Sequence, residues 1–396
     1  MESGAPFSPA SLDDVPNSPP RHEPTGFILR LAKALHVNGV PAYELEQTVN
    51  ACASRLGLGV QCMSTPTAIT LSILQPDTLP QTFVIRAAPG EVNIEQLRRL
   101  TDVASRVIDG VTDTVTGARE LKAIQRLPTP IGQLIWYLAY FVVSAALANI
   151  FGGGSREMLV AGLSGLSIAG LNHATRHSVF RHLLPALSAI AVTQLIWFFS
   201  AGLAWPLANQ LTLLSGLIIL LPGLSITIAL AELATQNLVS GTARLFGAAS
   251  ILIQLTFGSI IGMELAENLW GHPNEALVYD LPSWLPWFSA ACGSLALVPL
   301  FFARWRDGFW FVVAGLLAYG VTVFAQKYTT PHMAAFLSAT TVGVTANLAS
   351  RYLALPGATV LMPGFIMLVP GAMGYRGMLA MASHDMMTGL AKGFDV

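Results

Sequence analysis

The stretch Leu214-Ser-Gly-Leu-Ile-Ile-Leu-Leu-Pro-Gly223 returns 148 residues later as Met362-Pro-Gly-Phe-Ile-Met-Leu-Val-Pro-Gly371, aligned without a gap. A second matching pair keeps the same spacing: Ser240-Gly-Thr-Ala-Arg244 follows the first copy and Thr388-Gly-Leu-Ala-Lys392 follows the second. The Pro-Gly pair that ends each copy interrupts an apolar helix and frees backbone N–H and C=O groups. Because unpaired groups are costly in hydrocarbon, such breaks persist only against other protein or a watery cavity. Repeated broken helices therefore predict the binding site of a transporter.

The glycines and prolines of both copies are the candidate substrate-binding residues. Gly223 and Gly371 let the backbone open, and the freed amides at the N-terminus of a half-helix can hold a carboxylate. The alternative is a kink that serves only helix packing. The full candidate set is Gly216, Pro222, Gly223, Pro363, Gly364, Pro370 and Gly371.

Charge divides the chain into two parts. Residues 1–125 hold 10 Lys and Arg and 13 Asp and Glu, whereas residues 126–396 hold only 11 and 9 over more than twice the length. This contrast predicts a soluble part followed by a membrane part. The net charge of −1 argues against nucleic acid as a partner. The three cysteines lack metal-ligand or disulfide spacing, and we expect neither a metal nor a cofactor.

The soluble part is expected to be a small α+β domain over residues 26–125, after a disordered leader at 1–25 that is rich in Pro, Ser and acids. No signal peptide opens the chain, so this domain is expected in the cytoplasm. Apolar stripes at helical spacing and one stretch with a period of two predict its elements. They are helices over about 28–38 and 45–56, strands over 69–73 and 82–87, and a long amphipathic helix from Asn93.

A hydrolytic site in this domain is an alternative to a regulatory or gating role. Six polar side chains could be assembled into such a site, but their spacing does not demand it. No G-x-S-x-G motif or metal-ligand pair occurs there, which favours the regulatory role. The six residues are His36, Glu44, Glu46, Ser64, Thr65 and Thr67.

The membrane part is expected to contain two units of five helices, at residues 126–265 and 284–396. Five is an odd number, so the second unit must be inverted relative to the first, as in many secondary transporters. The excess of Arg and Lys in the inner segments places the N-terminus inside. The expected spans lie at 133–151, 158–174, 183–203, 209–230, 243–264, 284–302, 309–325, 333–349 and 356–375. A tenth helix is not found after Thr388–Lys392, and a shortened chain is favoured over a helix supplied by a partner.

Three ionisable residues are candidates for proton coupling or an ion pair. Glu232 lies ten residues past Pro222, and His384 and Asp385 stand together in an apolar stretch. Ionisable groups at membrane depth are costly and usually functional, and histidine titrates near neutral pH. The alternative for His384 and Asp385 is an interfacial loop with solvated charges. Glu264 is expected at the interface rather than in coupling.

A metal site is the weaker explanation of a histidine cluster at the inner end of the second helix. His173 and His177 are spaced i, i+4, as metal-binding pairs often are. No acid or cysteine lies nearby in the sequence to act as a third ligand, and Arg176 and Arg181 would repel a cation. A polar inner rim is therefore expected.

Three motifs in order resemble the threonine/serine exporter family. Leu31–Glu46 with Ser64–Thr67 and Val92–Leu97 is similar to its soluble domain, Leu214–Gly223 with Ser240–Leu245 to its first membrane unit, and Leu368–Gly377 to its second. The likeness covers nearly everything from residue 26 onward. It implies a ten-helix exporter in the cytoplasmic (inner) membrane that expels threonine and serine at the expense of the proton gradient.

Alternatives remain open beside that reading. The likeness extends to relatives with dicarboxylate cargo such as succinate, and a membrane-tethered hydrolase or a partner-dependent channel would also fit. No Walker-type phosphate loop occurs, which disfavours an ATP-driven pump. The expected partners are a small-molecule substrate, protons and the lipid bilayer, with homo-oligomerisation left open. The chain is not expected to be an enzyme.

Overall fold

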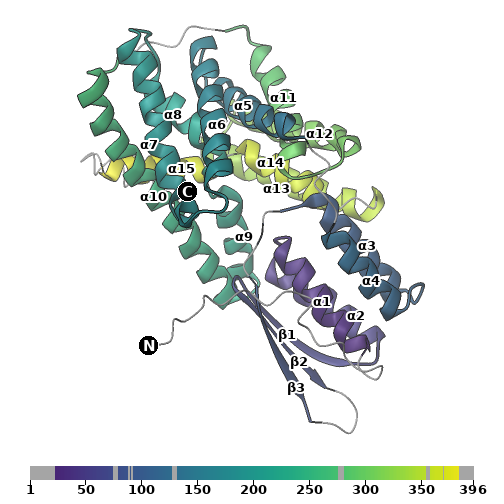
Figure 1. Cartoon of the computed structure of the whole chain (residues 1–396). Helices are drawn as coiled ribbons and strands as arrows, with labels where there is room; N and C mark the ends of the chain where they lie inside the picture. Colours follow the sequence, from purple (N-terminus) through teal and green to yellow (C-terminus); the bar gives the residue numbers. More distant parts are fainter. Residues whose placement is uncertain are drawn as a thin grey trace, which may run out of the picture. The chain divides into compact units, whose positions relative to one another are not determined.

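A computed structural model describes residues 23–74, 79–87, 90, 92–126, 132–274, 281–353, 357–368 and 370–382. The chain divides into two compact units (Figure 1). Unit 1 comprises Met1–Gly90 and Gln96–Leu127, and unit 2 comprises Glu91–Glu95 and Pro128–Val396. The predicted leader at 1–25 lies outside the described residues up to residue 22, and its last three positions already belong to the first helix.

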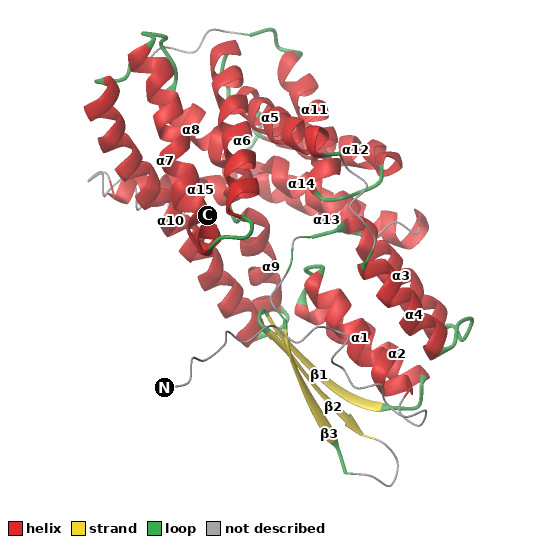
Figure 2. Ribbon diagram, in the orientation of Figure 1, coloured by secondary structure: helices red, strands yellow, loops and turns green. Residues whose placement is uncertain are grey.

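Unit 1 combines a three-stranded antiparallel sheet in the order β1-β2-β3 with helices (Figure 2). Its core gathers Phe27, Leu45, Leu71, Leu100 and Leu121, all fully buried and each from a different element. Burial of such side chains is the main stabilising term for a domain of this size. The elements are α1 (Glu23–Val37), α2 (Ala42–Arg55), β1 (Gly59–Thr65), β2 (Ala68–Leu74), β3 (Gln81–Arg86), α3 (Ile94–Ile108) and α4 (Thr114–Gln125).

Two local features of unit 1 differ from the sequence-based expectation. Strand β1 was not predicted, because its inward positions Cys62 and Ser64 are weakly apolar and give little period-two contrast. The long helix expected from Asn93 is two helices, since Gly110 turns the chain with φ 74° and Asp113 caps α4 by accepting from the Thr116 N–H at 3.3 Å. Glycine after a helix and aspartate before one are both recognised helix-end residues, so Gly110 and Asp113 predict this turn from the sequence.

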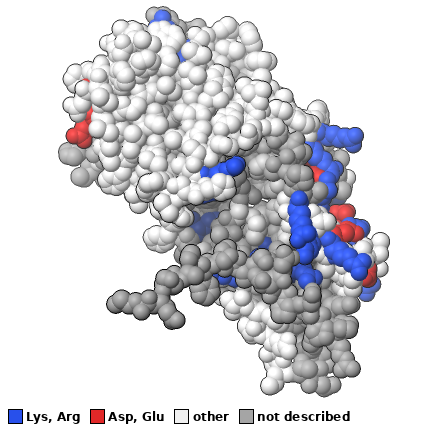
Figure 3. Space-filling view, viewed as in Figure 1, with Lys and Arg blue, Asp and Glu red and all other residues white. Residues whose placement is uncertain are grey.

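Unit 2 is helical, and most of its surface in Figure 3 carries no charged side chain. Among the described residues, five of its helical segments are long and apolar enough to cross a membrane, or six if the bent pair α8 and α9 counts as one span. Each of the nine expected spans contains a helix, and the number that cross the membrane stays a prediction. The helices are α5 (Gln133–Ile150), α6 (Ser155–Thr175), α7 (Leu184–Trp197), α8 (Asn209–Leu217), α9 (Gly223–Ala234), α10 (Leu238–Trp270), α11 (Leu285–Leu300), α12 (Gly308–Ala325), α13 (Pro331–Leu353), α14 (Ala358–Leu368) and α15 (Pro370–Ala382).

The turns after α5 and α11 have the same backbone hydrogen bonds at an offset of 150 residues. The Phe151 N–H donates to the Leu147 carbonyl and the Phe301 N–H to the Leu297 carbonyl, both at 3.0 Å. Gly152 has φ 93° and its counterpart Phe302 has φ 50°, so a left-handed residue occupies the same place in each turn. This correspondence extends the sequence repeat to a region where side chains alone do not reveal it.

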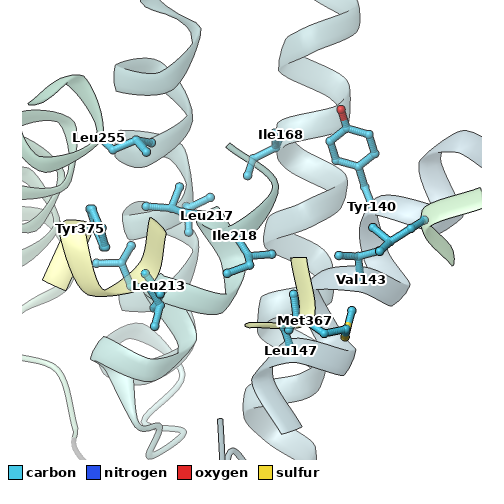
Figure 4. Close-up of a cluster of buried hydrophobic side chains, with 14 of the residues drawn as sticks. Tyr140, Val143, Leu147, Ile168, Leu213, Leu217, Ile218, Leu255, Met367 and Tyr375 are labelled. Carbon is cyan, nitrogen blue, oxygen red and sulfur yellow. The ribbon is translucent and has the colours of Figure 1, made fainter. Parts of the chain in front are cut away.

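Helix neighbours follow the same order in both halves. α6 packs against α5, α7 and α8, and α12 packs against α11, α13 and α14. The first helices of the halves, α5 and α11, pack against each other. Figure 4 shows Leu217 and Ile218, which precede the Pro222 break, between side chains of α5, α6 and α14 on one side and of α10 and α15 on the other. The break therefore begins inside the core of unit 2.

Candidate functional site

The first break falls at Pro222-Gly223, where the sequence predicts it. α8 gives way to a single 3-10 turn at Ile218–Leu220, and α9 starts at Gly223 with its axis bent by 59°. The Pro222 carbonyl already accepts the first helical bond, from the Ile226 N–H at 3.0 Å. The N–H groups of the first turn of α9 have no acceptor within their own helix and can serve a ligand.

The second Pro-Gly pair opens α15, which begins at Pro370; α14 ends at Leu368, and Val369 between them lies outside the described residues. Pro363 lies inside α14 and does not interrupt it. Among the described residues, the bent pair is therefore α8 and α9, and a break at Pro370-Gly371 stays a prediction. The Thr388–Lys392 segment lies outside the described residues.

Gly216 and Gly364 lie where neighbouring helices approach closely. A Cβ added to Gly216 would lie 3.0 Å from Cγ1 of Val192 and 2.8 Å from Cβ of Ser164. A Cβ added to Gly364 would lie 2.5 Å from Cγ1 of Val342, the residue 150 positions after Val192. Both glycines thus admit a valine from the preceding long helix, and this close packing is their visible role.

The two Pro-Gly pairs of the repeat lie against each other at Gly371 and Gly223. A Cβ on Gly371 would lie 3.0 Å from the Gly223 nitrogen, 3.2 Å from the Gly223 Cα and 3.3 Å from the Leu221 Cβ. Both glycines are buried. Residues 148 positions apart, at the same place in the repeat, are therefore in backbone contact, and the half-helix N-terminus of α9 faces the start of α15.

Helix α15 is also joined to α10 and to the end of α5. The Tyr375 hydroxyl is hydrogen bonded to Ser259 Oγ at 2.6 Å, and the Tyr375 side chain is 1% exposed. The Arg376 guanidinium lies over the Phe151 ring at 5.7 Å from its centroid. In the sequence, Tyr375 stands out only as part of the segment that resembles the family. Its hydrogen bond to Ser259 depends on how α15 packs against α10, which the sequence does not show.

Glu232 is buried and takes part in an ion pair. Its side chain is fully buried, and its two oxygens accept from Nε and Nη2 of Arg244, both at 3.1 Å. The pair joins α9 to α10 across a corner where Gln236 has φ 63°. Arg244 belongs to the Ser240–Arg244 motif, so the structure brings the proposed acid and that motif together.

The remaining candidates for proton coupling are placed as follows. His384 and Asp385 lie outside the described residues. Glu264 is exposed on α10, which continues to Trp270 instead of ending at the acid.

The histidine cluster does not form a shared face, because α6 ends at Thr175, before His177. His173 instead stacks near the Tyr137 ring, with centroids 6.4 Å apart. Among the described residues, no group of three or more His, Cys, Asp and Glu side chains is placed to hold a metal ion.

Some residues of the hydrolytic alternative do lie together in unit 1. The His36 Nδ1 is 3.3 Å from Ser64 Oγ, and its Nε2 is 3.2 Å from the Pro66 carbonyl and 3.1 Å from the Ala87 carbonyl. Glu46 accepts from the Ser64 backbone N–H at 2.8 Å, so it does not orient the imidazole through this bond. His36 and Ser64 are both nearly fully buried, and the contacts tie α1 to the sheet.

The thiols of unit 1 are poor nucleophiles. Burial raises the pKa of Cys52 to about 11. Burial, helped by the negative charge of Glu46, raises the pKa of Cys62 to about 12. Because the thiolate is the reactive form, both side chains stay protonated near neutral pH. Neither cysteine therefore supports covalent chemistry in this unit.

Two family profiles together match nearly the whole chain from residue 26. Residues 26–266 match the family described as "Putative threonine/serine exporter". Residues 287–396 match the one described as "Threonine/Serine exporter, ThrE". No solved structure matches the chain.

Curated relatives are distant but cover most of the chain. A threonine/serine exporter of Corynebacterium glutamicum is 24% identical over 314 residues, which is 76% of this chain and 63% of the relative. A pheromone-regulated membrane protein 10 of Eremothecium gossypii is 24% identical over 368 residues, 89% of this chain and 49% of the relative. The chain thus spans less than two thirds of either relative. With a profile matched over more than half of its length, and with apolar helices long enough to span a bilayer, this multi-pass membrane protein belongs to the threonine/serine exporter family.

Proposed function

We propose that this protein exports small polar amino acids, threonine and serine, and that the proton gradient drives the export. The observation that carries the proposal is the contact between Gly223 and Gly371, which brings the two repeated Pro-Gly pairs to one buried point. Paired broken helices are the construction on which many secondary transporters build a substrate site. The family relationship and the exporter of Corynebacterium glutamicum supply the cargo class.

The chemistry of the breaks suits a zwitterion. The free N–H groups at the start of α9 and the positive end of its helix dipole favour a carboxylate. The ammonium of the same amino acid needs a negative partner, for which Glu232 and Asp385 are the candidates. A dicarboxylate would leave such an acid facing a like charge. This difference favours amino acids over succinate as cargo.

The two five-helix units are proposed to be inverted. Residues 92–95 belong to unit 2, where the Ile94 N–H donates to the Phe301 carbonyl at 3.0 Å and Arg304 bonds Glu95 at 2.6 Å. We propose that the α11–α12 turn lies at the inner membrane face and the matching turn after α5 at the outer face, as inversion requires. The excess of Arg and Lys in the inner segments favours a cytoplasmic N-terminal domain.

A transport assay tests the function. The full chain is reconstituted in liposomes loaded with labelled threonine, serine, alanine or succinate, and release is measured with and without an imposed pH gradient. We expect threonine and serine release to accelerate with the gradient and to slow when a protonophore collapses it. Succinate release would support the dicarboxylate alternative, and release that ignores the gradient would support a channel. Labelling of unit 1 by a serine-directed activity probe would support the hydrolase.

Asp385→Asn is expected to uncouple export from the proton gradient. The substitution keeps the side-chain volume but removes the ionisable group, so threonine still binds while gradient-driven accumulation fails. His384→Ala should only shift the pH dependence, because this residue would tune the acid rather than replace it. The measurement is threonine accumulation at several values of the pH gradient. An unchanged pH response of Asp385→Asn would move the coupling role to Glu232 or Glu264.

A further inference from the structure

The ion pair between Glu232 and Arg244 closes the corner between α9 and α10. The corner is tight, since a Cβ on Gly241 would lie 2.7 Å from Leu233 Cγ and 2.9 Å from the Ala229 carbonyl oxygen. Two parallel N–H···O bonds of 3.1 Å give the pair the fork geometry in which arginine holds a carboxylate most firmly. Helix α9 is therefore held at this end by the ion pair and at its other end by the contact of Gly223 with Gly371.

A fully buried carboxylate needs a compensating charge or a proton. Removal from water is costly for the ionised form, and an unpaired charge in the interior is costlier still. Three species can satisfy Glu232: the Arg244 guanidinium, the ammonium of a bound amino acid, or a proton. Both carboxylate oxygens accept a bond from Arg244. One buried carboxylate balances only one positive charge, so cargo or proton takes the place of the guanidinium in this scheme.

We propose that Arg244 is a positioning residue that occupies Glu232 whenever neither cargo nor proton does, and that this ion pair locks the empty carrier. The inference rests on the proposed function. An exporter driven by proton exchange must not reorient empty, because each empty return lets cargo flow without proton movement. Since α9 is tied to α10 through the pair, its reorientation waits until Glu232 is neutralised. Arg244 thereby enforces the coupling and does not itself bind cargo.

The proton step is balanced in this scheme. On the outer side, a Glu232 oxygen takes a proton from water as the ammonium of the cargo leaves. The carrier returns with a neutral carboxylic acid, while Arg244 keeps its charge throughout. On the inner side the proton leaves to water, and the two N–H···O bonds from Arg244 form again unless cargo arrives first. One proton enters for each cargo that leaves.

The lock occurs in only one of the two repeats. The position that matches Glu232 in the second copy is Ala380, which has no acidic group. Helix α14, which packs against α9, carries no titratable side chain. On α15, Tyr375 is bonded to Ser259 and Arg376 lies over Phe151.

The other acids of α10 are too far away to govern Glu232. Glu264 and Glu267 lie 20 and 23 residues beyond Arg244, which at 1.5 Å per residue is about 30 Å or more. Arg244 is the charged side chain of α10 that bonds Glu232, through two bonds of 3.1 Å.

The test is the coupling of the reconstituted full chain. In Arg244→Gln we expect threonine release without a gradient to rise by a factor of about 5–150, the usual range of a coupling free energy. The number of protons that enter per threonine should fall below that of the unsubstituted protein. Arg244→Lys should retain part of the coupling, since it keeps the charge but not the fork.

Two further variants make the test independent of folding. Glu232→Gln with Arg244→Gln removes both charges at nearly constant volume, a replacement that buried ion pairs often tolerate. This double variant should unfold in detergent at about the temperature of the unsubstituted protein, which would show that the effects of Arg244→Gln arise from coupling and not from folding. Arg306→Gln, an exposed arginine on the turn before α12, is the matched control and should couple normally.

The outcomes separate the lock from the proposed function. If the unsubstituted protein shows no gradient-driven release of threonine or serine, the proposed function fails. If it does, but Arg244→Gln keeps the proton-to-threonine ratio, the lock is wrong. A double variant that unfolds in detergent at a much lower temperature than the unsubstituted protein would likewise overturn the lock and assign the pair a structural role alone.

Discussion

Gly371→Leu is expected to abolish threonine release while the protein still folds and inserts. The added Cβ would lie 3.0 Å from the Gly223 nitrogen and 3.2 Å from the Gly223 Cα, and these are backbone atoms that cannot rotate away. The rest of the leucine side chain would then push the two breaks apart. Since displacements of about 1 Å can cost about a hundredfold in turnover, we expect at least a loss of that size. The measurement is the initial rate of gradient-driven release.

Stability should fall by about 1–3 kcal/mol, the usual cost of overpacking. Part of this cost is offset because Gly371 stands at the start of α15 and leucine is a better helix former than glycine by roughly 0.5–1 kcal/mol. Gly371→Ala should show a smaller loss, because only the Cβ must be accommodated and a shift of a few tenths of an ångström suffices. The graded series alanine, valine and leucine should therefore slow transport in order of size. Release at the normal rate by Gly371→Leu would show that the contact is structural only.

Gly247→Leu is the matched control for this experiment. Gly247 also lies within a helix of unit 2, but a Cβ added there meets nothing within 4 Å. The substitution should leave release unchanged. A similar loss in both variants would indicate a general effect of leucine in these helices rather than separation of the two breaks.

The breaks could be predicted from the sequence, but their contact could not. A break at Pro222-Gly223 could be predicted because proline lacks the backbone N–H that a helix needs and glycine tolerates a non-helical backbone. Gly371 was singled out on the same ground. That the two lie against each other depends on how α8 and α14 pack between the long helices, which no local pattern encodes. Pro363 shows the limit of the local rule, since it has the same Pro-Gly pattern and yet lies inside a helix.

The acid in the first copy illustrates a second kind of limit. Glu232 was identified because an ionisable group in an apolar stretch is costly. Its partner Arg244 was also noted, but only as part of a repeated motif at the start of the next helix. Their pairing depends on the corner at Gln236, whose left-handed backbone folds α9 back onto α10. Nothing in the sequence shows that Gln236 has a left-handed backbone with φ 63°. Neither the corner between α9 and α10 nor the ion pair that depends on it could therefore be predicted.

The 150-residue correspondence reaches further than the motifs that first revealed it. Gly165 and Gly315 are counterparts, and so are Ser144 and Ser294. A Cβ on Gly165 would lie 2.4 Å from the Tyr140 carbonyl oxygen and 2.8 Å from Ser144 Oγ. A Cβ on Gly315 would lie 1.7 Å from Ser294 Oγ and 2.8 Å from Ser294 Cβ. Both glycines thus let the second helix of a unit approach a serine on the first.

Gly165→Ala and Gly315→Ala are expected to destabilise the protein, but only the second should be rescued. Overpacking of this kind typically costs about 1–3 kcal/mol. At Gly315 the closest atom is a side-chain hydroxyl, so Ser294→Ala removes it, and Ser294→Gly also removes the Cβ. At Gly165 the closest atom is a backbone carbonyl, which no substitution of Ser144 can remove. The measurement is thermal unfolding in detergent of the single and double variants.

The double variants test why glycine occupies positions 165 and 315. The cause is either the atomic contacts described above or a general preference for small residues in these helices. Gly315→Ala with Ser294→Gly should regain most of the stability lost by Gly315→Ala, less the roughly 1 kcal/mol cost of a glycine inside α11. Gly165→Ala with Ser144→Gly should stay close to Gly165→Ala. Gly170→Ala, where a Cβ meets nothing within 4 Å, is the control and should be neutral or slightly stabilising. Equal rescue at both sites would contradict the difference between the two helix pairs, because the Tyr140 carbonyl would then have to move aside as easily as a hydroxyl rotates.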